Sequence, residues 1–119
     1  MITDAVLEIP YGDYVELDIL VVDEEEIPVD VSRMQKRFTI KAQKSDPDNL
    51  AILTKLSPSD DIVDAGLGIV KVILHPDETR LDPGTYYFDL KLYSNSGVVI
   101  TPVVGKLKVL EVVWRGESQ

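Results

Sequence analysis

The stretch YYFDLKLY, residues 86–93, is the strongest strand signal in the chain. Side chains alternate between the two faces of a β-strand, so every second residue is expected to face the core: Tyr86, Phe88, Leu90 and Leu92. Asp89 and Lys91 lie between them and are expected in solvent. Residues 82–84, Asp-Pro-Gly, form a turn signal before this stretch, and residues 94–97, Ser-Asn-Ser-Gly, are typical of a hairpin loop after it.

The same period of two recurs along the rest of the chain. Residues 14–21 place four apolar side chains on one face: Val15, Leu17, Ile19 and Val21. Residues 70–74 do the same on a shorter scale. In all, the pattern predicts seven strands, at about 4–9, 13–22, 35–43, 51–56, 67–74, 85–93 and 98–112. Pro102 and Gly105 predict a bend or bulge near the middle of the last strand.

Helix signals are sparse. Residues 76–81 open with Pro and two acids, which predicts a single short helical turn. Seven short strands separated by turns, without a long helix, predict an all-β fold, an immunoglobulin-like antiparallel β-sandwich. The chain contains no repeat, linker or low-complexity tract, so residues 1–119 are expected to form a single domain.

Composition limits what the protein can do. The chain has 119 residues, 45% of them hydrophobic, and a formal net charge of −9. An acidic surface repels phosphate backbones, so no nucleic acid is expected as a partner. The absence of cysteine excludes disulfides and thiol catalysis, and a single histidine excludes a multi-histidine metal site. The N-terminus has no secretory signal, and no apolar run reaches the ~20 residues of a membrane span. Synthesis in the cytoplasm and no membrane contact are therefore expected.

Charge is distributed unevenly. Residues 1–30 contain ten acids and no Lys or Arg, whereas residues 31–44 contain five basic residues and no acid. One interpretation is pairing of opposite charges across neighbouring strands. The other is an exposed bipolar surface that docks on further copies of the chain or on a partner.

Residues capable of chemistry are present but lack supporting motifs. The acidic run 23–26 has neither the ligand spacing nor the glycine of a calcium loop, and Asp60, Asp61 and Asp64 are interpreted as a polar loop. His75 precedes a proline at a strand end, and no nucleophile motif accompanies it. No catalytic residue, metal site or cofactor is therefore expected, and the protein is predicted not to be an enzyme.

Four aromatic residues are candidates for an interface, because Tyr and Trp bury a large area at low entropic cost. They are Tyr14, Tyr87, Tyr93 and Trp114. Tyr87 and Tyr93 share the outer face of one expected strand, and Tyr14 is expected nearby, so the tyrosines predict a stripe that binds protein or sugar. Trp114 follows the last strand, where contact with a neighbouring subunit is expected.

Several segments together resemble a family of small phage structural domains. The segment from Asp82 to Leu92 matches a Pro-Gly-x-Tyr-x-aromatic-Asp-Leu strand, followed by a turn with Gly97 and a strand with Thr101 and Gly105. Residues 11–17, 27–31 and 68–81 fit the preceding parts of the same pattern. Over residues 6–110, the chain is similar to the N-terminal immunoglobulin-like domain of phage baseplate upper proteins and to related tail and neck domains. Two structural residues accompany this resemblance: Gly84 permits the turn, and Tyr86 is expected to act as a tyrosine corner that fixes the preceding loop.

The resemblance implies a non-enzymatic virion structural protein in a tail, baseplate or neck. Its expected partners are other virion proteins or further copies of itself, and its final location is the virion. The alternative is a carbohydrate- or cell-surface-binding module that uses the tyrosine stripe, and a third interpretation is an assembly chaperone absent from the finished particle.

Overall fold

The described chain, residues 2–113 of a computed structural model, consists of eight strands and one 3₁₀ turn. The elements are β1 (Ile2–Pro10), β2 (Val15–Leu20), β3 (Gln35–Lys41), η1 (Asp48–Leu50), β4 (Leu53–Leu56), β5 (Ile62–Gly66), β6 (Ile69–Leu74), β7 (Gly84–Tyr93) and β8 (Val99–Leu110). The expectation of an all-β chain is confirmed.

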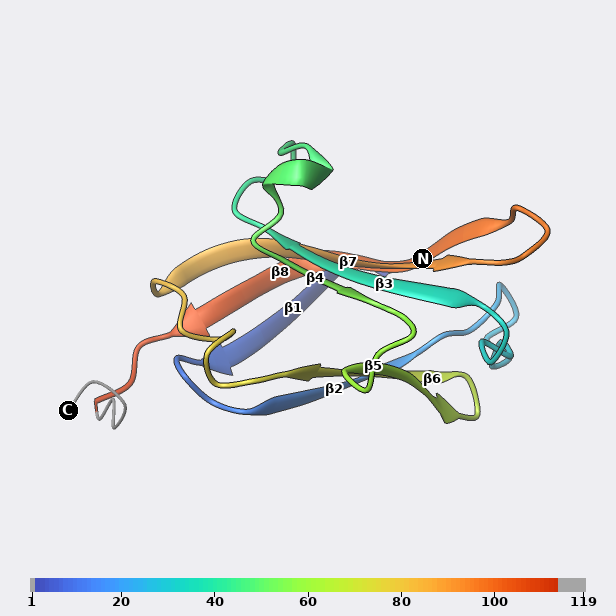
Figure 1. The fold of residues 1–119 in the computed structure, drawn as a ribbon, viewed down its shortest axis with the longest axis horizontal. Helices are drawn as coiled ribbons and strands as arrows, with labels where there is room; N and C mark the ends of the chain where they lie inside the picture. Colours follow the sequence, from blue (N-terminus) through green and yellow to red (C-terminus); the bar gives the residue numbers. More distant parts are fainter. Residues whose placement is uncertain (1, 114–119) are drawn as a thin grey trace.

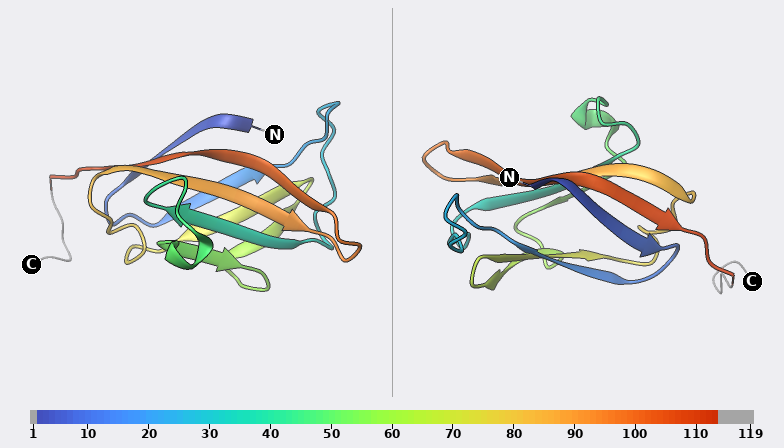
Figure 2. Two further views of the ribbon diagram at one scale, coloured as in Figure 1. Left: turned by 90° about the horizontal axis from the view of Figure 1, so that it is seen from above. Right: turned by 180° about the vertical axis from the view of Figure 1, so that it is seen from behind.

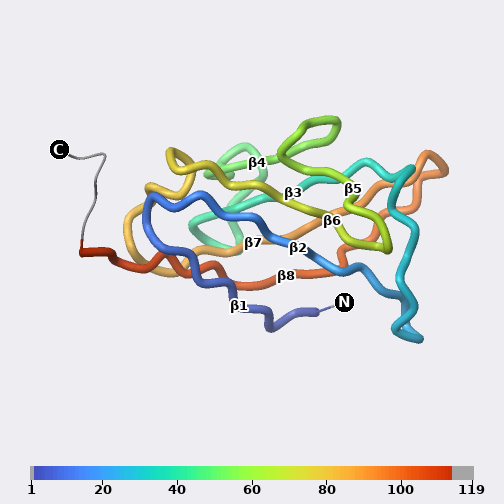
Figure 3. The backbone as a smooth tube through the Cα atoms, turned by 90° about the horizontal axis from the view of Figure 1, so that it is seen from below, coloured from blue at the N-terminus to red at the C-terminus, as the bar shows by residue number. Residues whose placement is uncertain are grey.

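The strands form two facing sheets, a sandwich-like arrangement that Figure 1 shows edge-on. The five-stranded sheet has the order β1-β8-β7-β3-β4, and the three-stranded sheet has the order β2-β6-β5. Figure 3 shows the same chain from the side of the three-stranded sheet. Buried residues from both sheets form the core, among them Phe38, Ile40, Val70, Val72, Leu74, Phe88, Leu90, Leu92, Leu107 and Val109.

The predicted inner faces are largely confirmed. In β7, Phe88, Leu90 and Leu92 are at most 3% exposed, while Tyr86 is only partly buried. The β7–β8 hairpin forms as expected, with the Ser94 amide donating to the Val98 carbonyl oxygen. Asp89 and Lys91 lie on the opposite face of β7, as expected, but both side chains are partly buried and not fully in solvent.

The expected strand number is one too low, because β5 was interpreted as part of a polar loop. Ile62, Val63 and Asp64 pair with β6, and the hairpin between them turns through Gly66, Leu67 and Gly68. Ile62 is 1% exposed. Only the first residue of this strand faces the core, which is why no alternating pattern marks it in the sequence.

The sheets are not purely antiparallel. β1 runs parallel to β8, with Leu7 opposite Leu107 and Ile9 opposite Val109. A side chain at Gly105 would collide with the Ala5 carbonyl oxygen, so glycine permits this close approach. The expected irregularity in the last strand is confirmed as a register shift against β7, between the pairs Leu90–Val103 and Leu92–Ile100.

A single turn forms within residues 76–81, as expected, but it is not part of a helix. This segment forms an isolated turn, in which the amides of Glu78 and Thr79 donate to the His75 carbonyl oxygen. The buried Thr79 hydroxyl contacts the carbonyl oxygens of Asp13 and Pro76, at 2.8 and 3.2 Å, which fixes the segment to the β1–β2 turn. The 3₁₀ turn lies instead at Asp48–Leu50.

Candidate functional site

The outer face of the five-stranded sheet carries two of the tyrosines that the sequence marks as candidates. Since Phe88, Leu90 and Leu92 point into the core, Tyr87 and Tyr93 lie on the opposite face of β7, with Asp89 and Lys91 between them. Both tyrosines are partly buried. Figure 2, left, shows this sheet from above, with β1, β8, β7 and β3 side by side.

Basic side chains surround these tyrosines. Tyr87 pairs in register with Lys41 of β3 and Lys106 of β8, and Lys91 pairs with Arg37. Lys44 lines a hollow beside Tyr87. We call this surface the basic face, defined by Arg37, Lys41, Lys44, Lys91 and Lys106. It is a positively charged patch on a chain whose net charge is −9.

The loop that contains the 3₁₀ turn is attached to one side of the basic face. Lys41 Nζ lies 2.8 Å from Asp48 Oδ1 and donates to the Asp46 carbonyl oxygen at 2.7 Å. Arg37 lies 3.6 Å from the other oxygen of Asp48. The hydrogen bond from Lys41 and the charges of Lys41 and Arg37 hold the pKa of Asp48 below its usual value. Two of the five basic side chains thus position this loop.

Asp89 lies at the centre of the basic face. Burial raises the pKa of Asp89, and the positive charges of Lys91, Lys41 and Arg37 offset only part of this effect. Among residues 2–113, no Lys or Arg nitrogen lies within 4 Å of its carboxylate. An ionised Asp89 is therefore partly desolvated without a direct ion-pair partner.

Two hollows flank the row of β7 side chains. One of about 260 Å³ lies beside Tyr93 and is lined by Arg37, Lys41, Asp89 and Lys91 among others. The other, of about 270 Å³, lies beside Tyr87, where Lys44 and Lys106 line it together with one acid, Asp4. The face is therefore uneven, with an aromatic ring and basic groups at each hollow.

The expected tyrosine stripe does not include Tyr14. Tyr14 directly precedes β2, which belongs to the other sheet, and its ring packs edge-on against His75 with the centroids 5.9 Å apart. Its hydroxyl donates to Glu16 Oε2 at 2.8 Å, and this bond raises the pKa of Tyr14. The placement near Tyr87 fails because β2 and β7 lie in different sheets. Trp114 lies outside the described residues.

The two residues assigned a structural role lie at the start of β7. The Tyr86 hydroxyl donates to the Asp82 carbonyl oxygen at 2.6 Å, so it fixes the loop that precedes the strand. Gly84 has φ of +153°, a conformation that L side chains rarely adopt. Both residues thus shape the entry to the strand that carries Tyr87 and Tyr93.

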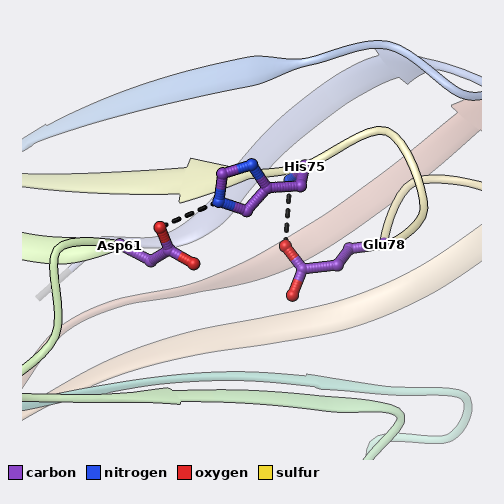
Figure 4. A group of neighbouring side chains, drawn as sticks. All are labelled: Asp61, His75 and Glu78. Carbon is purple, nitrogen blue, oxygen red and sulfur yellow. Dashed lines mark hydrogen bonds and ion pairs between the residues drawn. The ribbon is translucent and has the colours of Figure 1, made fainter.

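A second cluster of charged residues joins the two sheets. Lys55 projects inward from β4, and its Nζ lies 2.8 Å from Asp61 Oδ2 and 2.6 Å from both carboxylate oxygens of Glu78. Asp61 Oδ1 bonds His75 Nε2 at 2.9 Å, and Glu78 accepts the backbone amide of His75 (Figure 4). Asp61 directly precedes β5, and His75 directly follows β6. The buried ammonium group of Lys55 therefore links β4 to β5 through Asp61, and to the end of β6 through Glu78, which accepts the His75 amide.

Hydrogen bonds determine the protonation states in this cluster. Those from Lys55 and His75 lower the pKa of Asp61 below its usual range. Burial disfavours the protonated form of Lys55, but its bonds to Asp61 and Glu78 outweigh this effect and raise the pKa of Lys55. The charged forms of Lys55 and Asp61 are thus mutually stabilised.

The cluster supplies its own cation. One ligand atom each from Asp61, His75 and Glu78 lies within 4.8 Å of the others, a spacing that a metal ion can bridge. Lys55, however, already bonds Asp61 Oδ2 and both oxygens of Glu78, so an ammonium group occupies the place of a metal ion. His75 Nε2 bonds the Asp61 carboxylate and not a hydroxyl group that it could activate as a nucleophile. The arrangement is that of a structural ion-pair network.

The sequence patterns do not predict this network. They indicate a polar loop at Asp61 and a strand end at His75, and they do not single out Lys55 or Glu78. The available signal was the alternation in β4, which places Lys55 on the same side as Leu53. A lysine at an inward position requires carboxylate partners, so it could have prompted a search for them.

The acids of residues 1–30 do not pair with the bases of residues 31–44. Within the described chain, only Glu16 of the N-terminal acids forms an ion pair, with Lys71 at 3.4 Å. Arg37 and Lys41 use Asp48 instead. Pairing between these two segments is therefore wrong, although Glu16 and Lys71 do form an ion pair across the neighbouring strands β2 and β6.

Comparison of the sequence with models of known protein families and with curated proteins gives no match. Within residues 2–113, no helix has the length and hydrophobicity that a membrane-spanning segment requires. The arguments about function therefore depend on the fold and on these two charged regions.

Proposed function

We propose that this protein is a non-enzymatic structural component of a phage or prophage virion, an immunoglobulin-like domain of a tail, baseplate or neck. The observation that carries the proposal is the basic face. It presents Tyr87, Tyr93 and exposed lysines that have no acidic partner within the described chain. A sheet face with aromatic rings and unpaired charges is suited to protein–protein contact.

The local structure around β7 supports the family part of the proposal. The segment that resembles phage baseplate and tail domains forms the central strand of the five-stranded sheet. Its Tyr86–Asp82 hydrogen bond has the form of a tyrosine corner, in which a hydroxyl bonds the backbone a few residues upstream. Partners in this proposal are other virion proteins or further copies of the chain.

A second candidate function is carbohydrate or cell-surface binding. The hollow beside Tyr93 favours it, because an aromatic ring next to Asp89 and Arg37 combines a stacking surface with polar groups. A glycan array separates the two functions, since a protein with a purely architectural role binds no sugar. Specific binding that is lost in Tyr93→Ala would favour the second candidate.

The proposal is tested on purified particles. Particles from the source culture are purified on a density gradient, and their proteins are identified by mass spectrometry. A virion component is expected in stoichiometric amounts in the particle fraction. A protein abundant during assembly but missing from finished particles would contradict the proposal and would favour an assembly chaperone.

A further inference from the structure

The loop between β2 and β3 presents a preformed acidic tip. Asp23 builds its turn, because its carboxylate accepts the backbone amides of Glu25 at 2.8 Å and Ile27 at 3.0 Å. Glu24, Glu25 and Glu26 are exposed, and within residues 2–113 none of them forms an ion pair. We call residues 23–26 the acidic loop.

The basic face has unsatisfied charge of the opposite sign. Lys44 and Lys106 are exposed beside Tyr87, and neither forms an ion pair in the part of the chain that the structure describes. Among residues 2–113, Lys91 donates to the Thr101 hydroxyl, at 3.2 Å, and to no carboxylate. Three of the five bases are thus available to a partner.

The acidic loop and the lysines beside Tyr87 lie apart in one molecule. Figure 2, left, shows the connection between β2 and β3 extending from the end of the molecule, whereas the basic face is the outer surface of the five-stranded sheet. Glu24 and Glu25 share a hollow with Ile100 and Pro102 at the start of β8, whereas a different hollow, beside Tyr87, is lined by Lys44 and Lys106.

We infer that copies of this chain associate head-to-tail, with the acidic loop of one copy on the basic face of the next, around Tyr87, Lys44 and Lys106. Charge complementarity identifies the partner, because the chain itself carries the acidic surface that the basic face lacks. Such a contact joins two different surfaces, so a pair of copies still has one free acidic loop and one free basic face. Further copies can add at these surfaces, and the assembly can become a ring or a filament. The inference rests on the proposed role in assembly and names the partner.

The test uses two variants that each retain one half of the contact. Glu24→Gln/Glu25→Gln neutralises two charges of the acidic loop, and Lys44→Gln/Lys106→Gln neutralises the two lysines beside Tyr87. Each variant alone is expected to remain monomeric by light scattering at ~0.1 M salt, where distant charges are screened over about 10 Å. Their equimolar mixture should form a 1:1 pair with twice the mass of one chain, because one intact contact remains.

Matched controls keep the net charge of each variant. Asp60→Asn/Asp77→Asn changes the charge as the acidic-loop variant does, and Arg33→Gln/Lys71→Gln changes it as the basic-face variant does. Both controls should still associate alone, about tenfold more tightly than the variants do. A mixture that stays monomeric, or controls that dissociate equally, would overturn the inference.

This result is independent of particle composition. If the protein is found in particles but its mixed variants do not pair, the proposed function stands and the inferred contact is contradicted. If the variants pair but the protein is absent from particles, the inferred contact stands and the proposed function is contradicted.

Discussion

The lysines of this molecule differ sharply in what surrounds their charge. Lys55 has a side chain only 8% exposed and bonds two carboxylates, whereas Lys44 and Lys106 are exposed and have no ion-pair partner among residues 2–113. Lys55 therefore contributes to holding the two sheets together. Lys44 and Lys106 contribute little to the fold, and their charge remains available for binding.

The largest effect is expected from Lys55→Met. This change leaves Asp61 and Glu78 facing each other without their cation, and breaking such a partly buried pair should lower the free energy of unfolding by about 3 kcal/mol. Urea denaturation measures this loss. Lys71→Met is the control, because its exposed pair with Glu16 should be worth less than about 0.5 kcal/mol. Equal losses in both variants would mean that the cluster does not stabilise the fold.

Acid should weaken the same cluster. The pKa of Asp61 in the folded state lies below its ordinary value of 3.8, so its stabilising effect is complete above that pH and is lost as the pH falls through the folded value. Asp61→Asn should therefore be less stable than the unmodified chain at pH 7, and the two should converge as the pH falls below the pKa of Asp61 in the folded state. Unfolding curves across this pH range check the prediction. A constant difference between the two proteins would show that ionisation of Asp61 is not responsible.

Asp89 should behave in the opposite way. Its pKa is raised by burial, so its ionised form at neutral pH is a cost to the fold. Asp89→Asn is expected to raise the free energy of unfolding by about 0.5 kcal/mol at pH 7. The gain should shrink as acid protonates Asp89 in the unmodified chain. A loss of stability in this variant would indicate that Asp89 makes favourable contacts with the surrounding cations.

The smallest effect is expected on the basic face itself. Lys44→Ala and Lys106→Ala should each change the free energy of unfolding by less than about 0.5 kcal/mol, because neither side chain has an ion pair to lose within the described chain. Thermal unfolding of both variants provides the measurement. A large loss from either would place that lysine in the fold and not in binding.

The sequence predicted strands where alternation is strong and failed where a strand depends on distant contacts. Residues 86–93 and 70–74 alternate over several positions, and their buried faces are those expected. β5 has one core-facing residue, Ile62, and is defined by pairing with β6. The parallel pairing of β1 with β8 joins residues about a hundred positions apart, and local patterns do not specify it.

The charged regions show the same limit. The uneven charge of residues 1–30 and 31–44 is visible in the sequence, but whether these charges meet depends on the positions of β2 and β3 in different sheets. The prediction that Tyr14 lies near Tyr87 fails for the same reason. Tyr14 precedes β2 and Tyr87 lies in β7, and no local pattern indicates that these two strands belong to different sheets. For Lys55, the inward position was readable, yet its partners Asp61 and Glu78 lie 6 and 23 positions away.

The central claim is that this protein acts by binding through its basic face, with further copies of itself as the partner. Light scattering behind size exclusion, over a hundredfold range of concentration at ~0.1 M salt, tests it most directly. The account predicts a mass that rises above that of one chain as the concentration increases, and no such rise for Lys44→Gln/Lys106→Gln. A monomer at every concentration, or a rise that this variant leaves unchanged, would contradict it.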